Sequence, residues 1–296
     1  MTRPAFKPIS TFSIVARDPA NGDLGIAVAS KFLAVGAVVP YAKANVGAVA
    51  TQSYGNTSYG PRTVAALEQG VPLALISQAF KETDPDYAQR QYGLVDAAGH
   101  SVSVTGDACH PWAGGVAKDN LAVQGNLLTG PEVVDAMVAA FEASDDDLSG
   151  RLLAALRAGD DAGGDQRGRQ GAALYVVREG GGYGGFNDHY IDLRVDDHAD
   201  PVGELGRLLG LHRLYFASPR AEDGLTIEGD VARRLSRVLV AAGRLDEETH
   251  SWNETLGRAL HDLAGTENLE ERLLEPPLID RVVLDYLEDR YVDTSG

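Results

Sequence analysis

The Asn-Gly pair at residues 21–22 lies between two apolar runs and constrains the fold of this chain more than any other feature. The run TFSIVA, residues 11–16, alternates between two faces, and LGIAVAS, residues 24–30, is almost entirely apolar. Asn-Gly is the strongest short hairpin signal because both residues tolerate a positive φ. A nearly continuous apolar strand is typical of a sheet that is covered on both faces. The sequence therefore predicts a buried antiparallel hairpin over residues 11–30.

The order of the later elements predicts how that hairpin is covered. Apolar residues recur at helical spacing in two regions, and strand-like runs flank both of them. The expected strands are residues 36–42 and 43–53, a hairpin over 91–106, and residues 121–130, 170–185 and 190–197. The expected helices are two within residues 59–82, divided at QGVP, and residues 131–144 and 148–159. Strands and helices that come in separate blocks indicate an α+β sandwich in which helices cover antiparallel sheet.

A second region begins after the acidic stretch DDHADP. From Pro201 onward nearly every segment has helical periodicity. We therefore predict an N-terminal extension of residues 1–10, a main domain of residues 11–200 and a helical accessory domain of residues 201–296. We expect the accessory domain to support a homo-oligomer or to shape the entrance for a substrate.

The acidic composition excludes two classes of partner. A formal charge of −17 and a sequence pI near 4.7 would repel nucleic acid and anionic lipid surfaces. The chain has no run of about 18 apolar residues, and its first ten residues lack the apolar core of a secretory signal. A single cysteine, Cys109, excludes an internal disulfide framework and a cysteine-built zinc site. We expect a cytoplasmic protein without a metal or cofactor.

Thr11 opens the first predicted strand and is a candidate nucleophile. A hydroxyl needs a base to take its proton, and the α-amino group of the same threonine can serve when that threonine begins the chain. The unperturbed pKa of such an amine, near 8, suits a general base at neutral pH. Ten residues precede Thr11, so this chemistry requires their removal. The alternative is that Thr11 is simply a β-branched residue that suits a strand.

Two lysines could assist Thr11. Lys43 begins the predicted third strand, and it would meet Thr11 at one end of the sheet if that strand pairs beside the hairpin. A lysine ammonium there would lower the pKa of the threonine hydroxyl. Lys31, which ends the second strand next to Ser30, is the competing candidate. Either lysine alone could equally be a solvated surface group.

Two polar loops could complete a site. The stretch TQSYGNTSYGP lies between a strand and a helix, where free backbone N–H groups can stabilise an oxyanion, and we assign Ser53 and Gly55 to this role. The stretch AGGDQRGRQ precedes an apolar strand and contains Asp165, which could orient the nucleophile. Arg167 and Arg169 could receive a substrate carboxylate. The alternatives are an ordinary connection for the first loop and a flexible, salt-bridged loop for the second.

Three separated motifs carry a family resemblance: TFSIVARDPANGDLGIAVASK, then QGNLLTGPEVVDAM, then GGDQRGRQGAALYVV. Together they resemble the DUF1028 family over about residues 11–200, and that family looks like a branch of the N-terminal nucleophile (Ntn) hydrolases. The resemblance implies a four-layer αββα sandwich. The residues after Pro201 resemble the small domain attached to this family that is labelled as peptidoglycan-binding.

The proteasome β-subunit branch of that superfamily implies roles for individual residues. Its threonine nucleophile is similar in position to Thr11, its lysine to Lys43, and its later aspartate to Asp165. Its serine after a central strand falls near Gln124 and Asn126, and we assign Gln124 to binding of the oxyanion or the substrate. Its strand-two aspartate falls near Ser30, where the acid is missing.

The resemblance implies an amidohydrolase for a small amide, peptide or cyclic amide, with Asn126 and the loop after residue 52 stabilising the oxyanion. A non-catalytic binding module is the alternative: it would keep the cleft of this fold and recognise a glycan or peptide through the cleft and the helical tail.

Overall fold

The computed structural model describes residues 11–219 and 221–292, and the chain divides into two compact units, Met1–Leu208 and Leu209–Gly296. The division falls inside α5 (Pro201–Phe216), a few residues after the boundary that the sequence predicts. The predicted extension, residues 1–10, lies outside the described residues. Each unit is described by itself below.

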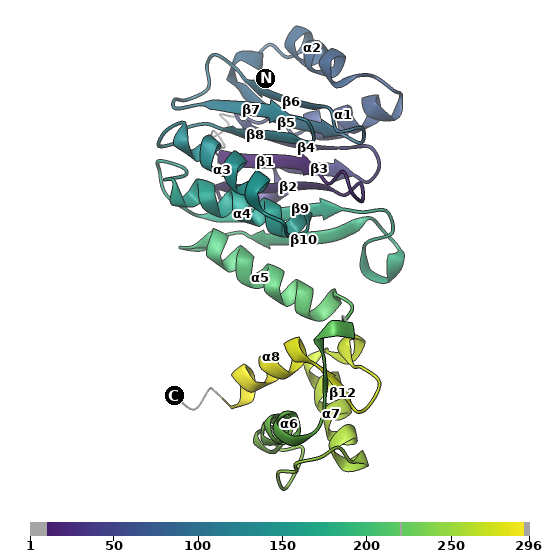
Figure 1. Ribbon diagram of the computed structural model, residues 1–296. Helices are drawn as coiled ribbons and strands as arrows, with labels where there is room; N and C mark the ends of the chain where they lie inside the picture. Colours follow the sequence, from purple (N-terminus) through teal and green to yellow (C-terminus); the bar gives the residue numbers. More distant parts are fainter. Residues whose placement is uncertain (1–10, 220, 293–296) are drawn as a thin grey trace, which may run out of the picture. The chain divides into compact units, whose positions relative to one another are not determined.

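A six-stranded sheet forms the centre of the first unit, in the order β10-β9-β2-β1-β8-β7, and all its neighbours are antiparallel (Figure 1). Its strands are β1 (Thr11–Arg17), β2 (Leu24–Ser30), β7 (Gly114–Lys118), β8 (Leu121–Gly125), β9 (Gly171–Val177) and β10 (His189–Val195). The predicted hairpin is confirmed, with Thr11 paired to Ser30 and Arg17 to Leu24. The sequence analysis missed β7, a short strand with two glycines.

A four-stranded antiparallel sheet has the order β3-β4-β5-β6. Its strands are β3 (Pro40–Lys43), β4 (Gly47–Ser53), β5 (Arg90–Asp96) and β6 (Ser101–Thr105). The prediction of one strand over residues 43–53 is wrong, because the chain reverses at Asn45, whose φ is 60°. Lys43 therefore ends one strand, and the next strand begins at Gly47.

Helices cover each sheet on its outer face (Figure 1). The four-stranded sheet contacts α1 (Tyr59–Glu68) and α2 (Leu73–Thr83), and the six-stranded sheet contacts α3 (Glu132–Ala143) and α4 (Leu148–Asp161). The α4 helix packs directly on β2, because a Cβ atom added at Gly25 would lie 2.5 Å from Leu152 Cδ1. Short 3-10 turns complete this unit at Val35–Ala37, Tyr87–Gln89 and Tyr183–Gly185.

The inner faces of the two sheets meet in a buried cluster of valine, alanine, leucine and isoleucine side chains. Val15 belongs to this cluster, and Ser13 donates a hydrogen bond to Gln52 of β4. Since side chains alternate along a strand, Thr11 shares the inter-sheet face with Ser13 and Val15. Phe12 lies on the other face, within 3.3 Å of a Cβ atom built at Gly159 of α4.

The second unit is mainly helical. Beyond the end of α5 it contains α6 (Gly229–Ala241), α7 (Glu254–Glu267) and α8 (Arg281–Tyr291), with 3-10 turns at Ala221–Asp223 and Glu270–Arg272. The sequence analysis missed one small sheet, β11 (Gly224–Thr226) and β12 (Leu278–Asp280). The leucine-rich faces of these helices form the core of the second unit. Within residues 11–219 and 221–292, no helix combines the length and apolarity that crossing a membrane requires.

Candidate functional site

Thr11 opens the central strand of the larger sheet and is fully buried. It is paired to Ser30 of β2 on one side, and its carbonyl oxygen accepts a hydrogen bond of 3.0 Å from the Asn126 N–H on the other. Paired residues of an antiparallel ladder project from the same face. Ser30 and Asn126 therefore flank Thr11 on the inter-sheet face, and we call this region of both sheets the Thr11 end.

Buried glutamine side chains connect the two sheets at the Thr11 end. Gln52 Nε2 donates to the Thr11 carbonyl oxygen at 3.2 Å and to Gln91 Oε1 at 2.8 Å. Ser13 Oγ donates to Gln52 Oε1 at 2.6 Å and receives a bond of 2.7 Å from Gln124 Nε2. The predicted binding residue Gln124 is therefore engaged between the sheets.

Gln91 is the centre of this network. Its Nε2 group donates to Thr105 Oγ1, to the Gly114 carbonyl and to the Gly125 carbonyl, at 2.9, 3.2 and 2.7 Å. Its Oε1 atom accepts from Asn126 Nδ2 at 2.9 Å as well as from Gln52. Fully buried, fully bonded amides of this kind hold one geometry, since each broken bond leaves a buried group unsatisfied.

The Asp165 loop meets the Thr11 end. The Asp165 carboxylate is almost fully buried, and its Oδ2 atom accepts a hydrogen bond of 3.0 Å from the Lys31 N–H, next to Ser30. The loop backbone also pairs with the segment after Asn126, through an Asp165–Leu128 bridge. Asp165 therefore joins the ends of β2 and β8, on either side of Thr11.

Both loop arginines are paired with carboxylates. Arg167 Nη2 lies 2.6 Å from Asp165 Oδ2, and Arg169 Nε lies 2.9 Å from Asp160 Oδ1. Lys31 Nζ donates to the Arg169 carbonyl oxygen at 3.0 Å, so this ammonium group is directed toward the loop. Both guanidinium groups are thus engaged by carboxylates of the protein, and the prediction that they bind a substrate carboxylate stays a prediction.

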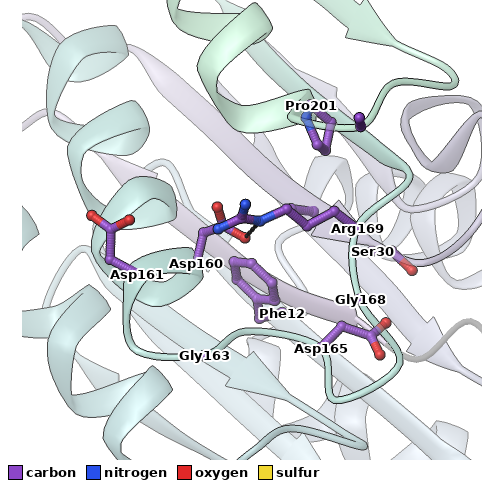
Figure 2. A pocket seen from close by; sticks show the side chains of 11 residues that line it. Phe12, Ser30, Asp160, Asp161, Gly163, Asp165, Gly168, Arg169 and Pro201 are labelled. Carbon is purple, nitrogen blue, oxygen red and sulfur yellow. Dashed lines mark hydrogen bonds and ion pairs between the residues drawn. The ribbon is translucent and has the colours of Figure 1, made fainter.

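A cavity of about 480 Å³ lies beside these residues (Figure 2). Its lining includes Phe12, Ser30, Asp160, Asp165 and Arg169. Figure 2 shows the Arg169 side chain extending toward Asp160 at the end of α4. Burial raises the pKa of the Asp160 carboxyl above its usual range, and the hydrogen bond from Arg169 opposes that rise. The cavity thus has a polar, charged wall and reaches Ser30, the strand partner of Thr11, but Thr11 itself does not line it.

The predicted oxyanion loop begins at the same end. Ser53 ends β4 with a φ of 65° and is fully buried, and Gly55 is half-buried. Burial raises the pKa of the Cys109 thiol, which donates a hydrogen bond of 3.4 Å to the carbonyl oxygen of Arg90, the residue that pairs with Ser53. The loop follows the strand that carries Gln52, but the roles assigned to Ser53 and Gly55 stay predictions.

Asp84 fixes the shape of that loop. Its carboxylate accepts hydrogen bonds of 2.9 Å from Asn56 Nδ2, from the Tyr59 hydroxyl and from Arg90 Nε. Arg90 also donates to the Tyr54 carbonyl oxygen. Burial alone would raise the pKa of Asp84, but these donors, Arg90 first, hold it well below its usual range.

Lys43 lies at the other end of the sheets, and the prediction that it meets Thr11 is wrong. It lines a second cavity together with Val177, which pairs with Leu24, and Leu24 pairs with Arg17 at the far end of β1. Its exposed ammonium group pairs with Glu68, and that hydrogen bond raises the pKa of Lys43. The physical reason is the reversal at Asn45, which turns Lys43 away from the Thr11 end. We call this region the Lys43 end.

Sequence reasoning missed Ser13, Gln52 and Gln91. A signal was present, because three apolar strands each carry a glutamine near one end, in VATQS, RQYGL and AVQGN. A glutamine within an apolar strand has to be bonded if it is buried. Three of them together indicate a shared network.

The family comparisons agree with the resemblance. A model described as "Family of unknown function (DUF1028)" matches residues 11–205. The chain belongs to the DUF1028 family. A second model, described as "Putative peptidoglycan binding domain", matches residues 215–287. No curated protein matches the chain.

A solved structure supports the same assignment. Protein SPO2555 from Silicibacter pomeroyi, which carries the DUF1028 family model, is 27% identical in sequence with a TM-score of 0.62. The match covers 82% of this chain and 100% of that chain. The family description assigns no activity, so the function has to be argued from the residues at the Thr11 end.

Proposed function

We propose that this DUF1028 protein is an amidohydrolase of the Ntn type, acting on a small amide, peptide or cyclic amide, with Thr11 as nucleophile once the leading residues are removed. The two facing sheets and their outer helices would then be the αββα sandwich of that class. One observation carries the proposal: Thr11 opens the central strand, on the inter-sheet face, where Ser30, Asn126 and the Asp165 loop converge.

The α-amine of Thr11 would supply the base. The hydroxyl oxygen of Thr11 would attack the substrate carbonyl carbon while its proton passes to the amine, and the amine would return a proton to the leaving nitrogen. Lys43 is remote from Thr11, and the Lys31 ammonium is bound to the Arg169 carbonyl. The amine of Thr11 is therefore the candidate base, and it exists only in a chain that begins at residue 11.

Asp165 would act as a positioning residue. It ties the Lys31 backbone and the segment after Asn126 to one loop, and its charge is balanced by Arg167. The adjacent cavity, with Asp160 and Arg169 in its wall, has room for the part of a substrate that does not react. Its charged wall favours a polar substrate group over an apolar one.

Covalent labelling tests the proposal without knowledge of the substrate. A β-lactone acylates an activated hydroxyl, so the chain that begins at Thr11 should gain one adduct, located on Thr11 by tandem mass spectrometry. Thr11→Ala should gain no adduct. Ser13→Ala should still be labelled at Thr11, since Ser13 is engaged by Gln52 and Gln124. Equal labelling of the parent and Thr11→Ala would rule out this function.

The match of residues 215–287 favours a second candidate, a non-catalytic module that binds a glycan or peptide. Calorimetric titration with muropeptide fragments distinguishes the two. Binding that survives Thr11→Ala, in a protein that the β-lactone does not label, would support the binding module. An absence of binding to any cell-wall fragment would count against it.

A further inference from the structure

Asn126 has a buried acceptor atom that the described structure leaves unused. The residue is fully buried, and its Oδ1 atom has no hydrogen-bond partner among the residues described. A buried acceptor without a partner destabilises the folded chain, because it has lost its hydrogen bonds to water. Such an atom in an otherwise fully bonded network points to a donor that arrives later.

The network fixes which atom of Asn126 is left over. Gln91 Nε2 faces the carbonyl oxygens of Gly114 and Gly125, which can only accept, so Gln91 Oε1 must be the acceptor for its other neighbours. Only the Nδ2 group of Asn126 can therefore face Gln91. Exchanging the amide nitrogen and oxygen of Asn126 would put two acceptors against each other. The free atom is thus Oδ1, and the predicted role of Asn126 as an oxyanion donor does not fit this orientation.

The ladder places the Thr11 nitrogen next to Asn126. In an antiparallel pair, the N–H and C=O groups of one residue point to the same neighbouring strand. The Thr11 carbonyl accepts from the Asn126 N–H, so the Thr11 nitrogen also lies on the β8 side. Both side chains share the inter-sheet face. In a chain that begins at residue 11, the amine is therefore a new donor on the side of Thr11 that faces Asn126.

We propose that Asn126 is a positioning residue whose Oδ1 atom accepts a hydrogen bond from the α-amine of Thr11. This inference rests on the proposed function, because it needs Thr11 to begin the chain. The bond would orient the lone pair of the amine toward the threonine hydroxyl and would set the pKa of the base. Asn126 would then tune the proton acceptor, and the oxyanion would be stabilised by other donors.

The pKa of the Thr11 amine tests this inference directly. In a chain that begins at Thr11 and is labelled with ¹⁵N-threonine, the ¹⁵N shift of the α-amine is followed from about pH 5 to pH 10, around its usual pKa near 8. Asn126→Asp places a negative charge beside the ammonium and should raise that pKa by about one unit or more. Asn126→Leu removes the acceptor and should lower it by roughly half a unit.

Gln124→Met is the matched control. It removes an amide from the same face of β8, two positions away, and should leave the pKa of the amine unchanged while lowering stability. Asn126→Ala, which introduces no clash, replaces either variant that does not fold and should lower the pKa as the leucine variant does. A pKa that stays the same in all Asn126 variants would overturn the inference. The pKa titration needs neither a substrate nor a covalent label. A failure of this inference can therefore be distinguished from a failure of the β-lactone to label Thr11.

Discussion

The Thr11 end and the Lys43 end belong to the same two sheets but differ in the burial of their polar groups. At the Thr11 end, Gln52, Gln91 and Asn126 are fully buried and bonded between the sheets. At the Lys43 end, the lysine pairs with Glu68 in solvent, and the neighbouring Phe186 is 91% exposed. Exposed groups need no partner, whereas buried amides are costly unless each is bonded. The Thr11 end is therefore the more rigidly held of the two, and it is where we propose the active site.

The largest expected effect is on turnover at Thr11. In the chain that begins at residue 11, Thr11→Ala should lower the rate of amide hydrolysis at least about 10³-fold, because the nucleophile is gone. Thr11→Ser keeps a hydroxyl and should stay within about tenfold of the parent rate. The measurement is release of amine from a panel of small amides, with circular dichroism to show that each variant is folded. If Thr11→Ala hydrolysed amides at the parent rate, Thr11 would not be the nucleophile, and nothing would distinguish the Thr11 end as the active site.

The next largest effect is on stability at Gln91. Gln91→Leu should lower the free energy of unfolding by about 3 kcal/mol, because Asn126 Nδ2 loses its acceptor, Gln52 Nε2 keeps only the carbonyl oxygens of Thr11 and Gln124, and the Gly125 carbonyl loses a donor. Gln78→Leu is the matched control, since Gln78 is exposed on α2 and donates a hydrogen bond to Glu82 within its own helix. It should change stability by less than about 0.5 kcal/mol. Urea unfolding of both variants measures the difference, and equal losses would contradict the buried network.

Acid should destabilise the loop at the Thr11 end through Asp84. The pKa of Asp84 is held below its ordinary value in the folded chain, so its contribution to stability is complete above the unfolded pKa near 4 and is lost as the pH falls below it. Asp84→Asn should lower the free energy of unfolding by about 2 kcal/mol at neutral pH and should have a smaller effect at about pH 3. Asp192→Asn, at an exposed ion pair with Arg194, is the control. The difference in free energy of unfolding between the parent and Asp84→Asn should become smaller as the pH falls. A difference that becomes larger would contradict a lowered pKa of Asp84 in the folded chain.

The smallest effect is expected at the Lys43 end. Lys43→Ala should leave turnover within about twofold of the parent and the urea midpoint unchanged, because an exposed ion pair contributes little. Lys31→Ala, at the Thr11 end, is the informative comparison, since its ammonium group holds the Arg169 backbone. If Lys43→Ala lost more turnover than Lys31→Ala, the active site would not be at the Thr11 end as proposed.

Local signals predicted most of the fold. Asn21 and Gly22 marked the first hairpin, and the change from two-residue to helical spacing separated strands from helices. Short strands with a weak apolar pattern were not predicted. In β7, for example, glycines take the place of the apolar residues of a typical strand. Such strands exist because their neighbours pair with them, and a single sequence does not display that pairing.

The candidate site was predicted in part, for reasons that individual residues illustrate. Five of the predicted residues do come together, because they lie at or next to strand termini at the same end of the larger sheet: Thr11, Ser30, Lys31, Asn126 and Asp165. Lys43 does not, because the turn at Asn45 reverses the chain within the stretch that was expected to be one strand. The buried glutamines were missed because their partners lie on strands far apart in the sequence. Strand order, which no local pattern encodes, brings these glutamines together.

N-terminal sequencing of protein that is active on an amide tests the central claim most directly. The account predicts that the first cycles give Thr-Phe-Ser, the sequence that begins at residue 11. Active protein whose first cycles give Met-Thr-Arg or Thr-Arg-Pro would contradict it, because Thr11 would then have no free amine to act as its base.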